Sequence, residues 1–116
     1  MKRVLKREEN MICRDIKVAG GFVQRMKGLM FRGSLAEGCG LYIPRCNSIH
    51  TFFMRFKIDA VFVDRDFVIV KIIDNLRPWR ITGFNWGARG VIELPAGTCF
   101  RHGLRKGDIL HMENGY

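Results

Sequence analysis

The stretch IDAVFVDRDFVIVKII, residues 58–73, carries the strongest structural signal in the chain. Two runs rich in β-branched and aromatic residues, IDAVFV and FVIVKII, are separated by the polar sequence DRD. Runs of this composition favour extended backbone, and a short polar break between two of them favours an antiparallel hairpin. We therefore predict a hairpin over residues 58–73 that turns at residues 64–66.

Several further runs around this hairpin have the pattern of short strands. The run MICRDIKVA alternates apolar and polar side chains, and GCGLYIP, HTFFMRF, VIEL and DILHM are short segments rich in apolar residues. The segment GGFVQRMKGLMFRGSL changes to helical spacing, which predicts one short helix over residues 22–31. The segment DNLRPWRITGFNWGARG contains a proline and three glycines, and its length predicts a loop with a function.

Strands at intervals of about 8 to 12 residues, together with one helix, are typical of a small β-rich domain. We predict a mainly β (α+β) fold with one short helix, arranged as a small closed or partly open β-barrel. The chain has 116 residues, of which 47% are hydrophobic, and this is enough for one core. We therefore expect a single domain over residues 11–116, preceded by a basic N-terminal tail over residues 1–10.

No apolar run reaches the roughly 18 residues that a membrane-spanning helix needs, and the start MKRVLKREEN has no stretch of signal-peptide length. We expect a cytoplasmic protein with no membrane partner. The four cysteines, Cys13, Cys39, Cys46 and Cys99, are then expected to be reduced thiols. The spacings C-x6-C-x3-H and C-x2-H match no standard zinc-ligand pattern, so neither a metal nor another cofactor is expected.

The formal net charge is +9, from 20 Lys and Arg against 11 Asp and Glu. Such a charge attracts phosphates, nucleic acid or acidic protein surfaces. The basic residues beyond the N-terminus are dispersed, and the chain has neither a helix-turn-helix pattern nor the aromatic-basic motif of RNA-binding modules. Nucleic-acid binding is therefore an alternative to the main prediction. The sequence does not fix the oligomeric state.

An ordered set of motifs carries a family resemblance: RMKGLMFR, CNSIHTFFMRFKIDAVFVD, RPW, VIELPAG and GLRKGD. Together, over residues 16–110, they resemble the domain of unknown function 192 family, small single-domain proteins of bacteria and archaea. The resemblance implies a compact, mainly β fold, and it implies no settled activity or catalytic residue. The segment GLRKGDILHM is similar to the GD box of cradle-loop barrels, in which Gly107 would allow a tight turn and Asp108 would accept backbone hydrogen bonds.

Three polar side chains lie within or beside apolar runs. His50 is placed at the rim of a predicted core, where an imidazole serves as a structural hydrogen bonder, a ligand contact or a general base. Asp59 stands at the entrance of an apolar strand, where it caps a turn, pairs with Lys57 or Arg77, or acts in catalysis. Glu93 interrupts VIEL and, if buried, either forms a structural ion pair with Arg77 or Arg89, or acts as a ligand hydroxyl acceptor or as a general base with a raised pKa.

Arg77 and Trp79 flank a proline in the long loop and offer a forked donor and a flat apolar face. The main prediction is a ligand-binding domain whose pocket is lined by His50, Arg77, Trp79 and Glu93, with Asp59 as a further candidate. The expected ligand is a small polar or anionic molecule, such as a sugar or phosphate compound.

Two other functions remain open: a hydrolytic enzyme that uses His50 with Asp59 or Glu93, and a basic module that binds nucleic acid or protein. Each function makes a different structural demand. An enzyme needs His50 and a carboxylate in mutual reach, and a nucleic-acid binder needs the arginines gathered on one face. A ligand binder needs a concave surface.

Overall fold

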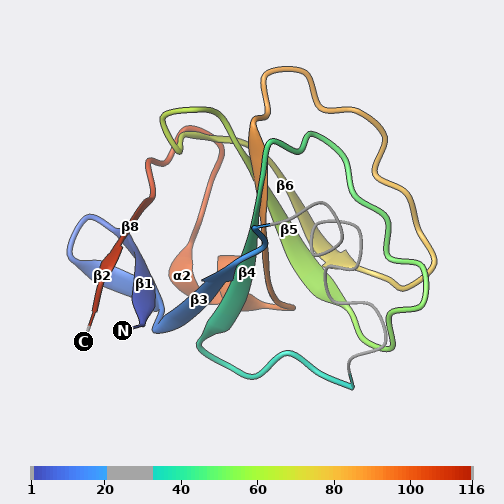
Figure 1. Cartoon of the computed structure of the whole chain (residues 1–116), viewed down its shortest axis with the longest axis horizontal. Helices are drawn as coiled ribbons and strands as arrows, with labels where there is room; N and C mark the ends of the chain where they lie inside the picture. The colour runs from blue at the N-terminus through green and yellow to red at the C-terminus, as the bar shows by residue number, and fades with distance from the viewer. Residues whose placement is uncertain (1, 21–32, 116) are drawn as a thin grey trace.

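The computed structural model of the chain describes residues 2–20 and 33–115 (Figure 1). The helix predicted over residues 22–31 lies outside the described residues. Within them, eight strands form two sheets, and one short helix is also present. The three-stranded sheet has the order β2-β1-β8, and its strands are β2 (Asn10–Cys13), β1 (Arg3–Arg7) and β8 (His111–Asn114).

The five-stranded sheet has the order β3-β4-β7-β5-β6. Its strands are β3 (Asp15–Val18), β4 (Cys39–Pro44), β7 (Gly90–Pro95), β5 (Ile58–Val63) and β6 (Ile69–Leu76). Only β3 and β4 are parallel, and the other neighbours in this sheet are antiparallel.

The mainly β class with one short helix is confirmed, but a closed barrel is not seen. In the described part of the chain, a single bridge between Val68 and Ile109 is the one strand-like pairing that links the two sheets. The helix that the structure describes is α2 (Thr98–His102), in a segment where we predicted none.

The predicted hairpin is confirmed as β5 and β6. One carboxylate oxygen of Asp64 accepts hydrogen bonds from the backbone N–H groups of Asp66, at 2.8 Å, and Val68, at 3.0 Å, and these bonds close the turn. All six residues of β5 are buried because the strand lies between β6 and β7 and both of its faces are covered. The sequence of β5 is therefore an apolar run instead of an alternating pattern.

Each face of the five-stranded sheet has its own apolar cluster. Ile92 and Leu94 of β7 pack with Leu5, Ile16 and other residues on one face. Val91 of β7 packs on the other face with a second set, which includes Ile43, Ile49, Met54, Ala60 and Phe62. Side chains alternate along a strand, so Glu93 shares the face of Val91.

The structure corrects three predictions near the N-terminus and the aromatic block. Residues 3–7 are β1 instead of a tail, because Val4 and Leu5 are buried and the strand pairs with both β2 and β8. The strand predicted from MICRDIKVA is divided at Arg14 into β2 and β3, which belong to different sheets. The segment HTFFMRF forms one bridge, His50 with Ile81, and then a turn, so it is not a strand.

None of the helices in residues 2–20 and 33–115 has the length and apolar character needed to cross a bilayer.

Candidate functional site

The two carboxylates predicted for the site, Asp59 and Glu93, point to opposite faces of the five-stranded sheet. The β5–β7 register pairs Asp59 with Leu94 and Ala60 with Glu93. Because paired residues share a face and neighbours alternate, Asp59 lies on the face of Leu94, and Glu93 lies on the other face. The predicted site therefore does not bring both carboxylates to one pocket.

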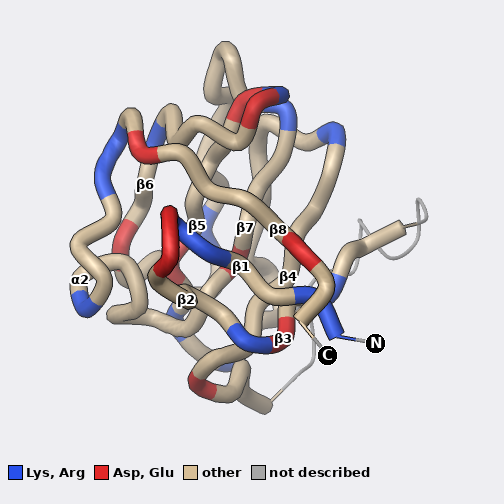
Figure 2. Tube along the Cα trace, turned by 90° about the vertical axis from the view of Figure 1, so that its left-hand side faces the viewer, with Lys and Arg blue, Asp and Glu red and all other residues tan. Residues whose placement is uncertain are grey.

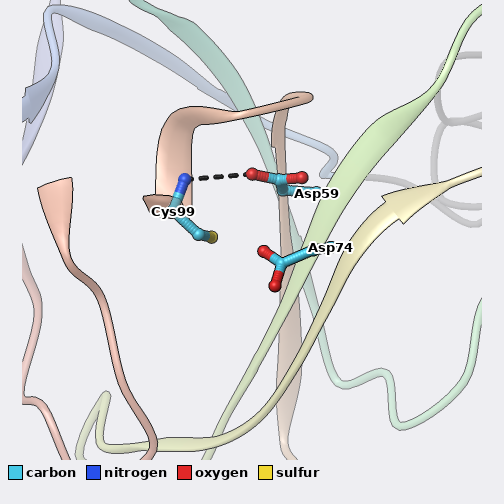
Figure 3. A group of neighbouring side chains, drawn as sticks. All are labelled: Asp59, Asp74 and Cys99. Atoms are coloured by element: carbon cyan, nitrogen blue, oxygen red, sulfur yellow. Dashed lines mark hydrogen bonds between the residues drawn. The ribbon is translucent and has the colours of Figure 1, made fainter. Parts of the chain in front are cut away.

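Asp59 is fully buried and organises the start of α2 (Figure 3). One carboxylate oxygen accepts hydrogen bonds from the N–H groups of Gly97, at 3.1 Å, and Cys99, at 2.9 Å. The other oxygen accepts a bond from the N–H of Asn75, at 3.0 Å. These three bonds connect β6 and α2 to β5. They give Asp59 a structural role of the capping kind that the sequence analysis considered for it.

Asp59, Asp74 and Cys99 form a group whose potential metal-ligand atoms lie within 4.8 Å of one another (Figure 3). Both oxygens of Asp59 already accept backbone hydrogen bonds, however. Burial raises the pKa of the Cys99 thiol well above its usual range, and the negative charge of Asp59 raises it further. A protonated thiol is a weak ligand and a weak nucleophile, so the group has the character of a structural cluster.

Glu93 is a second buried carboxylate, and its surroundings differ from those of Asp59. Its side chain is almost completely buried, and burial raises its pKa from 4.5 to about 8. In the described residues, the oxygen Oε2 of Glu93 has no hydrogen-bond partner and no ion pair includes the residue. At a pKa of about 8 the protonated form of Glu93 predominates at neutral pH. An ion pair with Arg77 or Arg89, the other alternative considered from the sequence, is not among the ion pairs of the described residues.

His50 and Trp79 lie on a common surface, connected through Phe52. The His50 and Phe52 ring centroids are 5.0 Å apart, and those of Phe52 and Trp79 are 5.6 Å apart. The half-buried His50 ring accepts a hydrogen bond at Nδ1 from the N–H of Phe52, at 3.2 Å. Arg77 is exposed two residues before Trp79, so the structure brings three of the five predicted site residues to one region.

That region consists of two loops, residues 45–57 and 77–89, which we call the paired loops (Figure 1). In Figure 1 they run side by side at the right of the molecule. Backbone hydrogen bonds of 2.8–3.0 Å join them along their length: Arg45 to Arg89, Asn85 to Asn47, Thr82 to Ile49, Thr51 to Arg80 and Trp79 to Thr51. The pairing is therefore a ladder that holds both loops in one layer.

Thr51 is the centre of this ladder. Its side chain is buried, and its hydroxyl donates a hydrogen bond to the carbonyl of Arg77, at 2.6 Å, and accepts one from the N–H of Arg80, at 2.8 Å. Trp79 lies between these residues with φ of 63°, a left-handed conformation that side chains rarely adopt. The Thr51 bonds hold the backbone in this shape and present the indole to the surface.

The paired loops differ sharply from the rest of the chain in charge. They contain no Asp or Glu, although the chain has 11 of these residues. They contain six basic side chains, all exposed: Arg45, Arg55, Lys57, Arg77, Arg80 and Arg89. Positive charge therefore gathers on this surface, although the basic residues are dispersed along the sequence.

A concavity of about 720 Å³ opens at one end of the paired loops, beside the β5–β6 turn. Arg45, Arg65 and Arg89 line it together with Trp86, and the remaining lining residues are Cys46, Asn47, Ser48, Gly87 and Ala88. No acidic residue lines it. We call this concavity the arginine pocket.

The arginine pocket is assembled from three separate segments, so the sequence analysis did not find it. The N–H of Arg45 bonds to the carbonyl of Arg89, at 2.8 Å, and the N–H of Arg89 bonds to the carbonyl of Val63, at 2.7 Å. These two bonds bring Arg45 and Arg89 beside the turn that carries Arg65. One sequence signal was present: both long loops lack acidic residues, and together they carry six basic ones.

Comparisons with solved structures support the fold. A crystal structure of a protein of unknown function from Novosphingobium aromaticivorans DSM 12444 matches with a TM-score of 0.81 and 22% identity, covering 94% of this chain and 82% of that one. A protein of Sinorhizobium meliloti 1021, described as a candidate transcription regulator, matches with a TM-score of 0.77 and 28% identity, covering 84% of this chain and 80% of that one. The first similarity, at 22% identity, concerns the fold alone.

Sequence relatives come from archaea. The UPF0127 protein of Pyrococcus horikoshii is 38% identical over 86 residues, which are 72% of this chain and 74% of that protein. The UPF0127 protein of Pyrococcus abyssi is 36% identical over 104 residues, which are 86% of this chain and 80% of that protein. The family described as uncharacterised ACR, the domain of unknown function 192, matches residues 3–112. The match covers nearly the whole chain, and the protein therefore belongs to this family.

Proposed function

We propose that the protein binds a small anionic ligand in the arginine pocket. The observation that carries the proposal is a concavity lined by three arginines and an exposed tryptophan, with no acidic side chain in its lining. Within the described part of the chain, none of the five ion pairs involves Arg45, Arg65 or Arg89. Their charges are therefore available to a ligand.

The three arginines favour a phosphate or carboxylate group. A guanidinium offers several N–H donors in a planar fork, which matches two oxygens of one such group. Asp64 and Asp66 flank Arg65 in the sequence, but neither lines the pocket, and one carboxylate oxygen of Asp64 accepts the backbone hydrogen bonds that close the turn. Three cations that line one concave surface, none of them in an ion pair among the described residues, attract an anion from solution.

Trp86 extends the preference from a bare anion to one that carries a flat group. Its side chain is 87% exposed, which is costly for a large apolar ring unless another surface covers it. A sugar ring or a nucleobase would stack on the indole while its phosphate meets the arginines. The ligand class is thus the one that the sequence analysis anticipated, a polar or anionic sugar or phosphate compound.

The location within the molecule differs from the predicted pocket. His50, Arg77 and Trp79 lie farther along the same paired loops, whereas Asp59 and Glu93 are internal to the sheet. Hydrolysis has less support, because Asp59 is engaged by three backbone donors and no hydrogen bond of the described residues joins His50 to a carboxylate. We also propose a reducing, cytoplasmic setting, which the four cysteines held as thiols support.

Calorimetric titration with inorganic phosphate, pyrophosphate and adenosine monophosphate at low and moderate salt tests the proposal. We expect adenosine monophosphate to bind, and we expect Arg45→Gln and Arg89→Gln each to weaken it by about tenfold or more, as for other charge-assisted hydrogen bonds. Arg105→Gln is the matched control, because Arg105 is exposed and lies outside the pocket. The proposal is rejected if adenosine monophosphate does not bind at millimolar concentration. It is also rejected if the pocket variants and the control variant lose equal affinity.

A further inference from the structure

Exposed aromatic rings continue along the paired loops beyond the arginine pocket. Their exposed fractions are large for side chains of this size: 87% for Trp86, 72% for Phe84, 55% for Trp79 and 46% for Phe53. The rings occur in two pairs, with centroids 6.3 Å apart for Phe84 and Trp86 and 4.8 Å apart for Phe53 and Trp79. One pair lies at the pocket, and the other lies at the far end of the ladder.

Basic side chains continue over the same distance. Arg55, Lys57, Arg77 and Arg80 are exposed and lie outside the arginine pocket. In the described residues, none of the four forms an ion pair. Because the paired loops contain no acidic residue, a ligand that is anionic along its whole length would meet only attraction there.

The ladder gives this surface a direction and a length. It begins at the Arg45–Arg89 bond, passes the Ile49–Thr82 bond, and ends where Thr51 meets Trp79 and Arg80. Extended backbone covers about 3.3 Å per residue, so the path from residue 45 to residue 51 is at most about 20 Å long. A mononucleotide bound in the arginine pocket would occupy one end of this path, and a longer ligand could extend toward the Phe53–Trp79 pair.

The rings at the far end are held in position by the backbone. Phe53 and Trp79 both adopt left-handed conformations, with φ of 66° and 63°. Trp79 is fixed by the bond from its N–H to the carbonyl of Thr51, at 2.9 Å. Conformations of this kind are costly and persist where the surrounding structure imposes them, which is frequent in binding sites. The rings are thus preorganised to receive a flat partner.

We propose that the paired loops bind single-stranded nucleic acid, with one phosphate in the arginine pocket and bases stacked on the ring pairs. This inference rests on the proposed function, because it identifies the anionic ligand of the pocket as part of a longer strand. A single strand offers what the surface requires: a regularly charged backbone for the arginines and unpaired bases with flat faces for the rings. A duplex buries those faces within its own stack.

An anionic membrane surface is the main competing partner, and the observations favour it less. A membrane-binding face needs apolar side chains directed outward together, with the charges around them. In the sequence, basic residues are interspersed with the rings: Arg80 follows Trp79, and Arg55 lies two residues after Phe53. Rings and guanidinium groups that are interspersed on the same two loops suit the bases and phosphates that alternate along a strand.

Fluorescence anisotropy with labelled DNA and RNA octamers tests the inference, because single-strand sites span about 4 to 16 nucleotides. We expect each octamer to bind at least tenfold more tightly than adenosine monophosphate. With about four phosphates neutralised, log K should fall with log salt at a slope of about −3. The same octamers in duplex form, and vesicles of phosphatidylserine and phosphatidylcholine, are the comparison ligands.

Matched variants separate the surface from general charge. Trp79→Ala should weaken octamer binding by about 5- to 150-fold, as for other stacked bases, and Arg80→Gln should reduce the salt slope. Phe100→Ala is the ring control, since Phe100 is 89% exposed but lies on α2. Trp79→Phe keeps a ring and should retain most of the affinity, which shows that a loss in Trp79→Ala is not misfolding of the loop.

The outcomes distinguish the two proposals. If adenosine monophosphate binds and the octamers bind no more tightly, the strand inference fails and the proposed function stands. If neither binds, both fail. If Trp79→Ala and Phe100→Ala have equal effects, or if duplexes or anionic vesicles bind more tightly than the octamers, the surface is not a single-strand site and the inference is overturned.

Discussion

The three-stranded sheet and the paired loops use their charged residues in different ways. On the sheet, basic and acidic residues lie side by side (Figure 2), as in the ion pairs Lys6–Glu113, at 2.6 Å, and Arg7–Asp108, at 3.0 Å. The paired loops carry six basic residues and no acidic one. The rest of the chain has 14 basic and 11 acidic residues, so it contributes +3 to a net charge of +9.

This difference teaches that net charge alone does not indicate a function. In the sheet region Lys6 and Arg7 have acidic partners within the protein, so their charges are compensated there. In the paired loops the basic residues have none among the described ion pairs, so their charge is available to a ligand. The comparison therefore predicts large stability effects where polar groups are satisfied internally, and small ones on the loops.

The largest effect is expected at Asp59, whose carboxylate accepts three backbone hydrogen bonds. Asp59→Ala leaves those buried donors without a partner and should lower the free energy of unfolding by about 3 to 5 kcal/mol. Urea denaturation measures it. Asp66→Ala, at an exposed carboxylate, should change stability by less than about 0.5 kcal/mol. Equal effects of the two changes would contradict the structural role of Asp59.

A pH-dependent effect is expected at Glu93, a buried carboxylate whose Oε2 accepts no hydrogen bond within the described part of the chain. Its pKa is 4.5 ordinarily and about 8 in the fold, because burial disfavours the charge. Below pH 4.5 both folded and unfolded chains hold the proton, so there is no penalty. Between pH 4.5 and 8 only the folded chain holds it, so stability falls as pH rises, by up to about 1.4 kcal/mol per pH unit.

Glu93→Gln removes this proton equilibrium. The difference in unfolding free energy between the variant and the wild type should be small at pH 4 and grow in favour of the variant up to about pH 8. Urea denaturation at intervals of one pH unit measures it. A difference that stays constant from pH 5 to pH 8 would show that Glu93 is ionised in the folded protein.

A smaller effect is expected at Thr51, which belongs to the paired loops but has a structural role. Thr51→Val keeps the shape of the side chain and removes the hydroxyl that bonds to Arg77 and Arg80. We expect a loss of about 1 to 3 kcal/mol, because the partly buried N–H of Arg80 loses its acceptor. Thr51→Ser retains the hydroxyl and is the matched control. If Thr51→Val and Thr51→Ser have the same free energy of unfolding, the ladder does not depend on this hydroxyl.

The sequence predicts the parts of this fold that depend on local patterns. The hairpin of residues 58–73 and the strand at VIEL follow from runs of β-branched residues. Strand β1 is missed because its sequence, RVLKR, has more charged than apolar residues, and only Val4 and Leu5 face the core. Helix α2 is missed because its capping group is Asp59, 40 residues before Cys99.

The candidate site is harder to predict for a similar reason. Arg77, Trp79 and His50 share a surface because the ladder through Thr51 joins two loops that are 26 or more residues apart. The three pocket arginines come together through backbone bonds to Arg89 and Val63. Sequence patterns identify which residues suit an anion, but the pairing of irregular loops determines which of them meet, and that pairing has no periodic signal.

The smallest stability effect, and the sharpest test of the comparison, contrasts two arginines. Arg7 donates hydrogen bonds to the Asp108 carboxylate, at 3.0 Å, and to the carbonyls of Gly103 and His102. Arg7→Gln should lower the free energy of unfolding by about 1 to 2 kcal/mol, more than a single exposed ion pair contributes, because the hydrogen bonds to two backbone carbonyls are also lost. Arg89→Gln should change it by less than about 0.5 kcal/mol.

Ligand binding should show the reverse order. Arg89→Gln removes one of the three pocket cations and should weaken binding of adenosine monophosphate, whereas Arg7→Gln should leave the affinity unchanged because Arg7 lies in the other sheet. Thermal unfolding and calorimetric titration of the two variants measure both quantities. If Arg89→Gln destabilises the fold as much as Arg7→Gln does, the pocket arginines are structural, and the separation between a charge-paired sheet and charge-exposing loops does not hold.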